Sequence, residues 1–193
     1  MFTEECIVFD LETTGLDPNT SEITEIGAWH FKDGVAVNKF EQFVRTEKPI
    51  PPEITKLTGI TNDMVKDADT VETVLLDFLA FIGDLPLVAY NLPFDSSFLI
   101  SKGNFHSIDV MRNGDRLGLD ALAVARRCFP NVSHKLTDMT QMLGIELKNA
   151  HRASYDAYAT KLVLDRCQGF VFTPIIDKSE YGTAQNEKTL PFV

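Results

Sequence analysis

Two acidic residues leave a hydrophobic segment together near the start of the chain. Asp10 and Glu12 end the apolar run Cys6–Phe9 and lead directly into a Thr13-Thr14-Gly15 turn. Because side chains at i and i+2 of a strand face the same side, both carboxylates should point the same way. The first basic residue of the chain is Lys32, so no cation is near in sequence. Burying such a pair is costly, and a divalent cation would remove that cost.

The pair alone also fits an exposed strand end with two solvated acids, so other acids must converge on it to indicate a metal site. Asp95 is placed in the first turn of a helix predicted from about Phe94, after the short apolar strand 86–90. An acid at that position also interacts favourably with the helix dipole, which is a common structural role.

A third segment, His151–Ala157, adds an acid and an imidazole. Ala153 and Ala157 begin a stripe of small residues at helical spacing, and Asp156 lies beside that stripe. Asp156 is therefore expected at the edge of a helix face that packs on the sheet. His151 precedes the helix and can reach the same place, although a histidine near a helix start is more often structural or exposed.

The remaining pattern predicts the elements that position these residues. Strands are expected over 5–11, 23–31 and 35–44, with the last two joined by an Asp33-Gly34 hairpin turn. A proline-rich loop then leads to a short helix from about Glu53. Further helices are expected over 71–82, 119–128, 135–143 and 152–167. We predict an α/β fold with a mixed five-stranded sheet, an antiparallel meander first and parallel strands after it, flanked by helices.

Composition limits the class of protein. The chain has 193 residues, 44% of them hydrophobic, and a formal net charge of −10. The acidity is concentrated in residues 1–95, which hold 18 acidic and 6 basic residues. Seven basic residues of the second half are candidates for phosphate contacts, or else solvated surface charges: Arg112, Arg116, Arg126, Arg127, Lys135, Lys148 and Arg152.

Features of the sequence favour a cytoplasmic protein with no membrane partner. Its three cysteines are widely spaced and odd in number, which indicates neither a disulfide framework nor a zinc site. The N-terminal MFTEEC lacks the basic region of a signal peptide, and no apolar run approaches the roughly 20 residues of a membrane span. We expect a domain over residues 1–168 and a flexible tail over 169–193.

The acidic motifs occur in the order and context of a known family. Asp10-x-Glu12-Thr13-Thr14-Gly15, Asn91-x-x-Phe94-Asp95 and His151-Arg152-Ala153-x-x-Asp156-Ala157 resemble the motifs of DEDDh (DnaQ-like) 3′→5′ exonucleases. The resemblance runs from about residue 5 to 168. Within that family, the chain is most similar to the proofreading epsilon subunit, or exonuclease domain, of bacterial DNA polymerase III.

The resemblance implies a ribonuclease H-like fold and two Mg²⁺ or Mn²⁺ ions at the scissile phosphate. Asp10, Glu12, Asp95 and Asp156 would hold the ions, and His151 would be the general base. It also implies that Thr13, Leu16, Asn91 and Phe98 contact the 3′-terminal nucleotides, with core packing as the alternative for Phe98.

The expected activity is hydrolysis of DNA 3′ ends, single-stranded or frayed, to nucleoside 5′-monophosphates in proofreading or repair. Two alternatives stay open: an exoribonuclease acting on RNA ends, and a non-catalytic module associated with a polymerase or a sliding clamp. The segment Glu187–Phe192 resembles the peptide with which proofreading subunits contact the clamp, although an ordinary disordered tail is the favoured interpretation.

Overall fold

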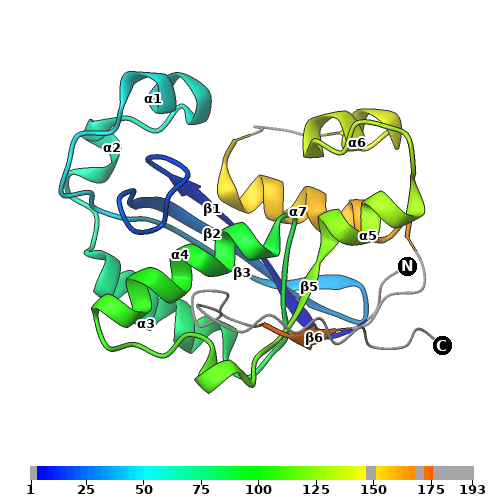
Figure 1. Cartoon of the computed structure of the whole chain (residues 1–193), viewed down its shortest axis with the longest axis horizontal. Coiled ribbons are helices and arrows are strands. Elements are labelled where there is room, and N and C mark those ends of the chain that lie inside the picture. The colour runs from blue at the N-terminus through cyan, green and yellow to red at the C-terminus, as the bar shows by residue number, and fades with distance from the viewer. Residues whose placement is uncertain (1–3, 147–150, 168–171, 176–193) are drawn as a thin grey trace, which may run out of the picture.

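A computed structural model describes residues 4–146, 151–167 and 172–175. Its centre is a mixed sheet in the order β3-β2-β1-β4-β5-β6 (Figure 1). The strands are β1 (Cys6–Thr13), β2 (Ile23–Lys32), β3 (Val35–Phe43), β4 (Leu87–Ala89), β5 (Leu117–Asp120) and the two-residue β6 (Thr173–Pro174).

Strand directions match the predicted mixture. β1, β2 and β3 form an antiparallel meander, and β4 and β5 run parallel to β1. The hairpin between β2 and β3 turns at Asp33 and Gly34, both with positive φ (51° and 78°), as the Asp-Gly signal predicted.

Seven helices and one 3₁₀ turn are present among the described residues. They are α1 (Pro52–Thr58), α2 (Asn62–Val65), α3 (Val71–Ile82), α4 (Leu92–Phe105), the 3₁₀ turn η1 (Arg112–Gly114), α5 (Ala121–Cys128), α6 (Leu136–Met142) and α7 (Ala153–Leu164). The expected helix over 71–82 coincides with α3. None of these helices is both long and apolar enough to span a bilayer.

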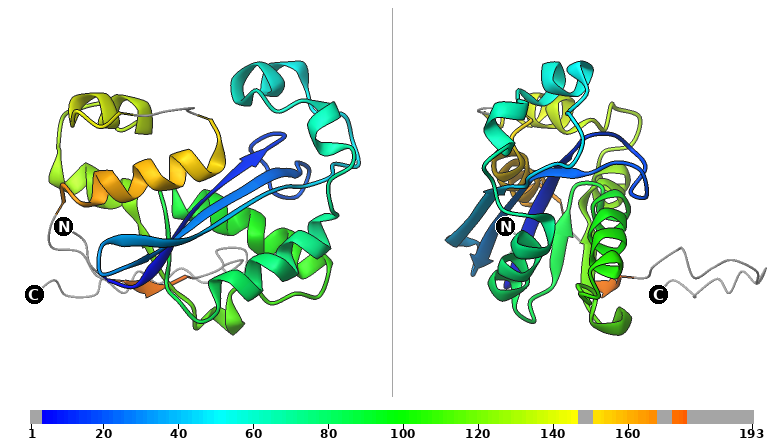
Figure 2. Two further views of the ribbon diagram at one scale, coloured as in Figure 1. Left: turned by 180° about the vertical axis from the view of Figure 1, so that it is seen from behind. Right: turned by 90° about the vertical axis from the view of Figure 1, so that its left-hand side faces the viewer.

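Each face of the sheet has its own hydrophobic core. Ile7, Phe9 and Leu11 of β1 pack with residues of α3 and α4. Cys6 and Val8 point to the other face and pack with residues of α5, α6 and α7. Figure 1 shows these two groups of helices on opposite sides of the sheet, and Figure 2 shows α1 and α2 standing apart from α6 at one end of the molecule. Alternation along β1 thus assigns Asp10 and Glu12 to the α7 side.

Helix α7 lies directly on β1 and β2. Its predicted stripe of small residues is buried, with Ala153, Ala157 and Thr160 all fully covered. The close approach depends on Gly27 of β2, because a Cβ atom there would lie 2.1 Å from the backbone nitrogen of Ser154. The start of α7 is therefore in backbone contact with the sheet.

Two strands of the structure, β5 and β6, were not predicted from the sequence. Residues Leu119 and Asp120, expected to start a helix, belong to β5, and that helix begins only at Ala121. β6 lies in the segment predicted to be a flexible tail, where it pairs with β5, and Ile175 beyond it is 5% exposed. Both strands are too short for a periodic pattern and form because a neighbouring strand edge and a core are available to them.

Replacing Gly27 with alanine should separate α7 from β2. The added methyl group cannot fit against Ser154 without a backbone shift, so we expect unfolding free energy to fall by about 1–3 kcal/mol. Gly59→Ala is the control, since a Cβ there meets nothing within 4 Å and only its positive φ of 74° opposes the change. Urea unfolding of both variants checks this, and a Gly27→Ala loss no larger than that of Gly59→Ala would contradict it.

Candidate metal centre

The carboxyl half of β1 brings two acids to the face covered by α7. Glu12 pairs in register with Glu25 of β2, and Asp10 pairs with Gly27, which α7 touches. Glu12 is only 9% exposed, although it ends a strand. The two side chains that the sequence placed on one side are thus enclosed beneath the start of α7.

Asp95 reaches the same region from the neighbouring strand. It lies in the first turn of α4, just after β4, and is 3% exposed. Its Oδ1 atom accepts a hydrogen bond from the backbone N–H of Leu11 at 3.2 Å. Because Leu11 lies between Asp10 and Glu12 in the sequence, this bond holds the Asp95 side chain against the same part of β1. The carbonyl of Asn91 accepts from the N–H of Asp95 at 3.3 Å, while the Asn91 side chain is exposed.

Asp156 and His151 complete the group from α7. The Oδ2 atom of Asp156 accepts a hydrogen bond from the backbone N–H of His151 at 3.1 Å. His151 has φ of 65°, a left-handed conformation that is strained for a side-chain-bearing residue. This turn carries the imidazole back over the acids.

The donor set fits a divalent cation. The Oδ1 atom of Asp156 is buried and accepts no hydrogen bond from the described part of the chain. Glu12, His151 and Asp156 each offer one ligand atom, and these atoms all lie within 4.8 Å of one another. A buried carboxylate oxygen without a partner is costly unless a cation or water reaches it, so the site has the chemistry that a hard cation with oxygen ligands requires.

Burial and the neighbouring negative charges raise the pKa values of the acids on β1. Burial raises the pKa of Glu12 to about 8, and the charges of Asp156, Glu25 and Asp95 contribute in the same direction. Burial also raises the pKa of Asp10 well above its ordinary range, with the charge of Asp95 as the next largest cause.

The two acids from helix starts show the same effect, partly offset by hydrogen bonds. Burial raises the pKa of Asp95 to about 8, although the N–H groups of Leu11 and of Asp95 itself act to lower it. Burial raises the pKa of Asp156 to about 6 against the hydrogen bond from His151. Without a cation, several of these acids hold protons at neutral pH.

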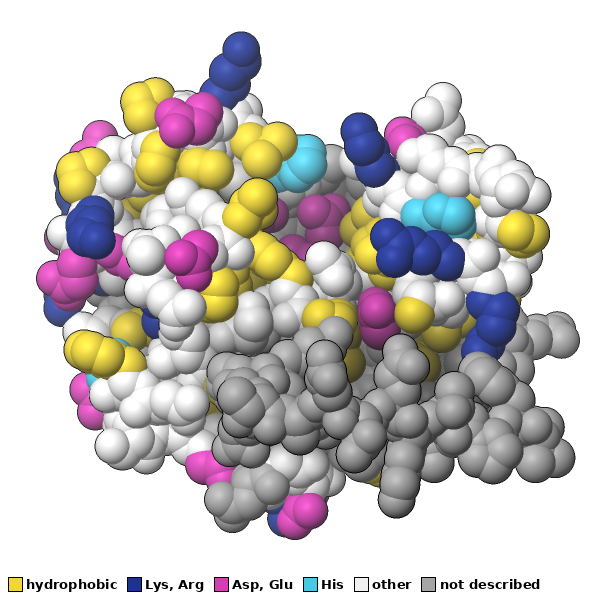
Figure 3. Space-filling model, in the orientation of Figure 1, with side chains coloured by type: hydrophobic (Ala, Val, Ile, Leu, Met, Phe, Trp, Pro, Cys, Tyr) yellow, Lys and Arg dark blue, Asp and Glu magenta, His cyan; other side chains and the backbone are white. Residues whose placement is uncertain are grey.

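The centre opens into a hollow on the molecular surface. Figure 3 shows acidic side chains within it and a histidine at its rim, flanked by hydrophobic side chains and, on one side, by Lys and Arg. Leu16, on the loop after β1, is 84% exposed. That loop is held to α4, because Ser101 Oγ and Lys102 Nζ both donate to the carbonyl of Pro18 at 3.0 and 2.8 Å.

Two other residues predicted to contact a substrate, Phe98 and Thr13, make contacts within the protein. Phe98 is fully buried and packs on Phe94 with ring centroids 5.1 Å apart, which favours the core-packing alternative, and its contact with substrate stays a prediction. Thr13 donates its hydroxyl to the carbonyl of Gly15 at 2.7 Å, which fixes the turn.

Several of the candidate phosphate-binding arginines already have partners within the described residues. Arg112 Nη1 donates to Asp84 Oδ1 at 2.6 Å. Arg116 is 4% exposed and donates to the backbone carbonyls of Val110, Leu85 and Gly83. Arg152 binds Glu25. Lys148 lies outside the described residues.

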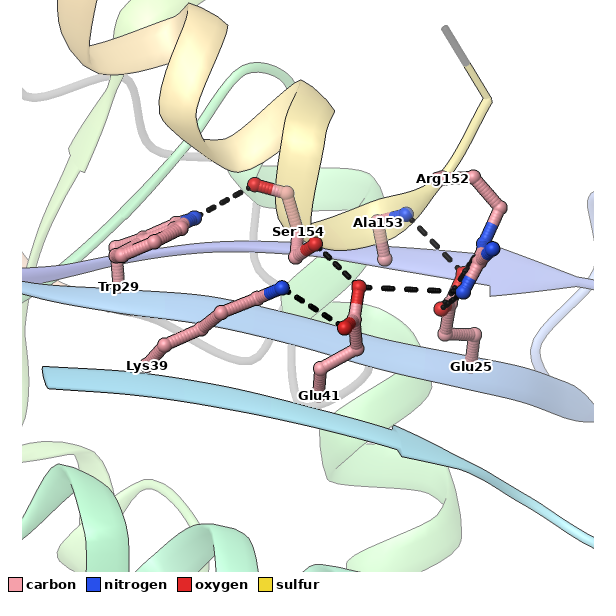
Figure 4. Close-up of polar contacts among 7 residues, drawn as sticks. All are labelled: Glu25, Trp29, Lys39, Glu41, Arg152, Ala153 and Ser154. Carbon is pink, nitrogen blue, oxygen red and sulfur yellow. Dashed lines mark hydrogen bonds and ion pairs between the residues drawn. The ribbon is translucent and has the colours of Figure 1, made fainter. Parts of the chain in front are cut away.

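Sequence reasoning missed the groups that anchor α7 (Figure 4). Glu25 is fully buried and accepts hydrogen bonds from Arg152 and from the backbone N–H of Ala153. A charged residue inside the apolar run 23–31 was the available signal. Asp120 was also missed: it caps α5 by accepting from Leu122 N–H at 3.1 Å, and its charge raises the pKa of Asp95.

Comparison with known families agrees with this arrangement. Residues 7–164 match the family model described as RNase_T: Exonuclease. A sheet with acids converging at the carboxyl ends of β1 and β4, covered by α7, thus defines a nuclease-type fold, and the chain belongs to the RNase_T exonuclease family.

Individual relatives show to which proteins of this family the chain is similar. The chain is 39% identical over 167 residues to the PolC-type DNA polymerase III of Halalkalibacterium halodurans, and 38% identical over 163 residues to that of Bacillus subtilis. These alignments cover 86% and 83% of this chain but 11% of each polymerase, so the chain spans about a tenth of the relatives' length. The resemblance inferred from the motifs is confirmed at the level of the family and of these polymerases.

Solved structures share the fold. E. coli exonuclease I in complex with a dT13 oligonucleotide aligns with a TM-score of 0.74 and 21% identity, over 85% of this chain and 42% of that chain. The nuclease domain of 3′hExo, a DEDDh family member bound to rAMP, aligns with a TM-score of 0.70 and 22% identity, over 86% and 92%. The mixed, helix-flanked sheet predicted from the sequence is therefore confirmed as an exonuclease-type fold.

Stability without metal should fall as the pH rises. Unfolded acids titrate near pH 4, whereas Glu12 and Asp95 titrate at about 8 and Asp156 at about 6 in the fold. The unfolded chain therefore binds fewer protons between pH 4 and 8, and unfolding becomes more favourable across that range. In EDTA we expect a lower Tm at pH 8 than at pH 6. This difference in Tm should be smaller when Mn²⁺ replaces EDTA, and it should also be smaller in the Asp156→Asn variant. An equal fall in Asp156→Asn would contradict a contribution from that residue.

Proposed function

We propose that this chain is a metal-dependent 3′→5′ exonuclease that hydrolyses phosphodiester bonds at DNA 3′ ends and releases nucleoside 5′-monophosphates. The observation that supports the proposal is that Glu12, His151 and Asp156, from separated segments, bring ligand atoms within 4.8 Å of one another, beside an Asp156 Oδ1 atom that has no partner among the described residues. The charges of Asp95, Glu12 and Asp156 also act on Asp10. Membership of the exonuclease family supports hydrolysis of a nucleic acid, and the direction and the metal dependence are ours to propose.

The acids would hold two Mg²⁺ or Mn²⁺ ions. When bound, such ions polarise the phosphate and make coordinated water a stronger nucleophile. We assign ion binding to Asp10, Glu12, Asp95 and Asp156. The enclosure of Glu12 and Asp95 excludes bulk water from one side of the site, and the hydrogen bond from Leu11 holds Asp95 in place.

His151 is assigned the role of general base. Its position before α7, fixed by the hydrogen bond to Asp156, places an imidazole beside the acids, where it accepts the proton of the attacking water. The imidazolium then offsets negative charge that develops on the phosphate.

The 3′ end would enter the hollow past Leu16. The exposed side chain is held on a loop that Lys102 fixes to α4, so it can press against the terminal base without moving away. Thr13 and Asn91 border the same end of the sheet and are proposed to line the nucleotide site.

DNA is favoured over RNA as the substrate. The relatives at 37–42% identity are DNA polymerases, which supports a role in proofreading or repair in the cytoplasm, with DNA polymerase III as a partner. The alternative of an RNA 3′ end has one observation in its favour, the 3′hExo nuclease domain bound to rAMP. The proposed clamp contact at Glu187–Phe192 lies outside the described residues.

Nuclease activity should require both the metal and the acids. On a 5′-labelled oligonucleotide with Mg²⁺, we expect stepwise shortening from the 3′ end, which EDTA or a 3′ block abolishes. Asp10→Asn and Asp156→Asn should lower kcat by at least about 10³-fold, because each removes part of the charge that holds the ions.

Substrates and a control complete this test. DNA and RNA oligonucleotides of one sequence distinguish the two substrates, and faster RNA cleavage would favour the alternative. Asp77→Asn, an exposed acid on α3, is the control and should keep full activity. Activity of the unaltered protein that survives EDTA, or full activity of Asp10→Asn with Mg²⁺, would sink the proposal. A protein that binds Mn²⁺ and cleaves nothing would indicate the non-catalytic module.

The Leu16→Ala substitution should weaken substrate binding without changing the stability of the protein. Because the side chain is 84% exposed, its removal should leave Tm unchanged. Loss of the contact with the terminal base should raise KM for oligonucleotides by about 10-fold, in line with one base-stacking contact. Steady-state kinetics on single-stranded DNA check this. Leu76→Ala, an exposed leucine of α3, is the control, and an unchanged KM for Leu16→Ala would remove Leu16 from the nucleotide site.

A further inference from the structure

We propose that Arg152, bound to buried Glu25, is a positioning residue that sets where His151 and Asp156 stand relative to β1. The proposal rests on the function proposed above and names how that site is held. It comes from the contacts of three segments: β2, the residue before α7, and the first turn of α7 (Figure 4).

Glu25 offers a fixed point on the sheet. It is 0% exposed and lies opposite Glu12 in the β1–β2 register. Its Oε1 atom accepts from Arg152 Nη2 at 2.7 Å, and both its oxygens accept from Arg152 Nε at 3.2 Å. The planar fork of the guanidinium therefore fixes the orientation of Arg152 as well as its distance.

The backbone of Arg152 connects this fixed point to Asp156 and, through Asp156, to His151. Its carbonyl accepts hydrogen bonds from the N–H groups of Tyr155 at 2.9 Å and Asp156 at 3.1 Å. The side chain of Asp156 in turn accepts from His151 N–H. Both groups proposed to act on the substrate are thus linked to Glu25 through one residue.

A second set of contacts limits sliding of the helix along the sheet. Glu41 of β3 accepts from Ser154 Oγ and from Lys39 Nζ, the latter at 2.8 Å. Trp29 Nε1 donates to the carbonyl of Ser154 at 2.8 Å. These contacts hold Ser154 and do not reach His151. Glu41 also lies 3.9 Å from Arg152 Nη2, and Glu25 also accepts from the Ala153 N–H, so Arg152, which adjoins His151, is held by both acids.

The arrangement explains why a buried ion pair is present at this place. Glu25 lies next to a group of acids, where another negative charge adds repulsion. A pair of apolar residues would anchor a helix without that cost. The ion pair instead supplies a directional bond at the residue adjacent to His151, which apolar packing cannot do.

Arg152→Lys tests the role because it keeps the charge beside Glu25 and removes the fork. The matched control is Arg116→Lys, a buried arginine on the α4–β5 connection that also loses several hydrogen bonds. Two measurements are made below both melting temperatures: amide hydrogen exchange over residues 153–157 in the metal-free protein, and kcat and KM on single-stranded DNA with Mg²⁺.

We expect faster exchange over 153–157 in Arg152→Lys only. Its kcat should fall on the order of 10- to 100-fold, as for a reacting group displaced by about 1 Å, with KM within about threefold of the unaltered protein. Arg116→Lys should lower Tm and leave kcat unchanged. A kcat for Arg152→Lys within about threefold of the unaltered protein, or an equal loss in Arg116→Lys, overturns the proposal.

Failure of the proposed function gives a different result. If the unaltered protein cleaves no oligonucleotide, the exonuclease assignment fails, and the exchange measurement is joined by calorimetric titration with Mn²⁺. Positioning by Arg152 then predicts faster exchange together with weaker Mn²⁺ binding in Arg152→Lys. Unchanged exchange and unchanged Mn²⁺ affinity would refute it independently of activity.

Discussion

Repulsion among acids enclosed in one small volume is the constraint that the rest of the structure must oppose. Asp10, Glu12, Asp95 and Asp156 approach one another under α7, and burial makes each harder to ionise. Such a group stays together only if the elements that carry it are fixed by interactions elsewhere. A divalent cation bound among these oxygens would relieve the repulsion that the fold sustains.

The two hydrophobic cores supply that opposing stability. β1 contributes Ile7 and Phe9 to one core and Val8 to the other, so the strand that carries two of the acids is held from both faces. The third and fourth acids enter at helix starts, where backbone N–H groups partly compensate their burial. Rigid elements thus carry the four acids, while the exposed Leu16 is on the loop after β1.

Contacts at the start of α7 connect this scaffold to the chemistry. Gly27 permits backbone contact, Glu25 orients Arg152, and Asp156 holds the strained His151. Strain of this kind persists where the surroundings over-determine the backbone. This segment therefore fixes the imidazole of His151 and the carboxylate of Asp156 relative to the sheet.

The sequence by itself determined which side chains could do the chemistry and on which elements they lie. Alternation placed Asp10 and Glu12 together, the Asp33-Gly34 signal fixed the hairpin, and small-residue spacing identified the buried face of α7, because these are local properties. Only the tertiary structure decided the short strands β5 and β6, the burial of Phe98, and the pairing of Glu25 with Arg152. Those depend on partners up to 127 residues away in sequence, and no local pattern specifies which partner will be there.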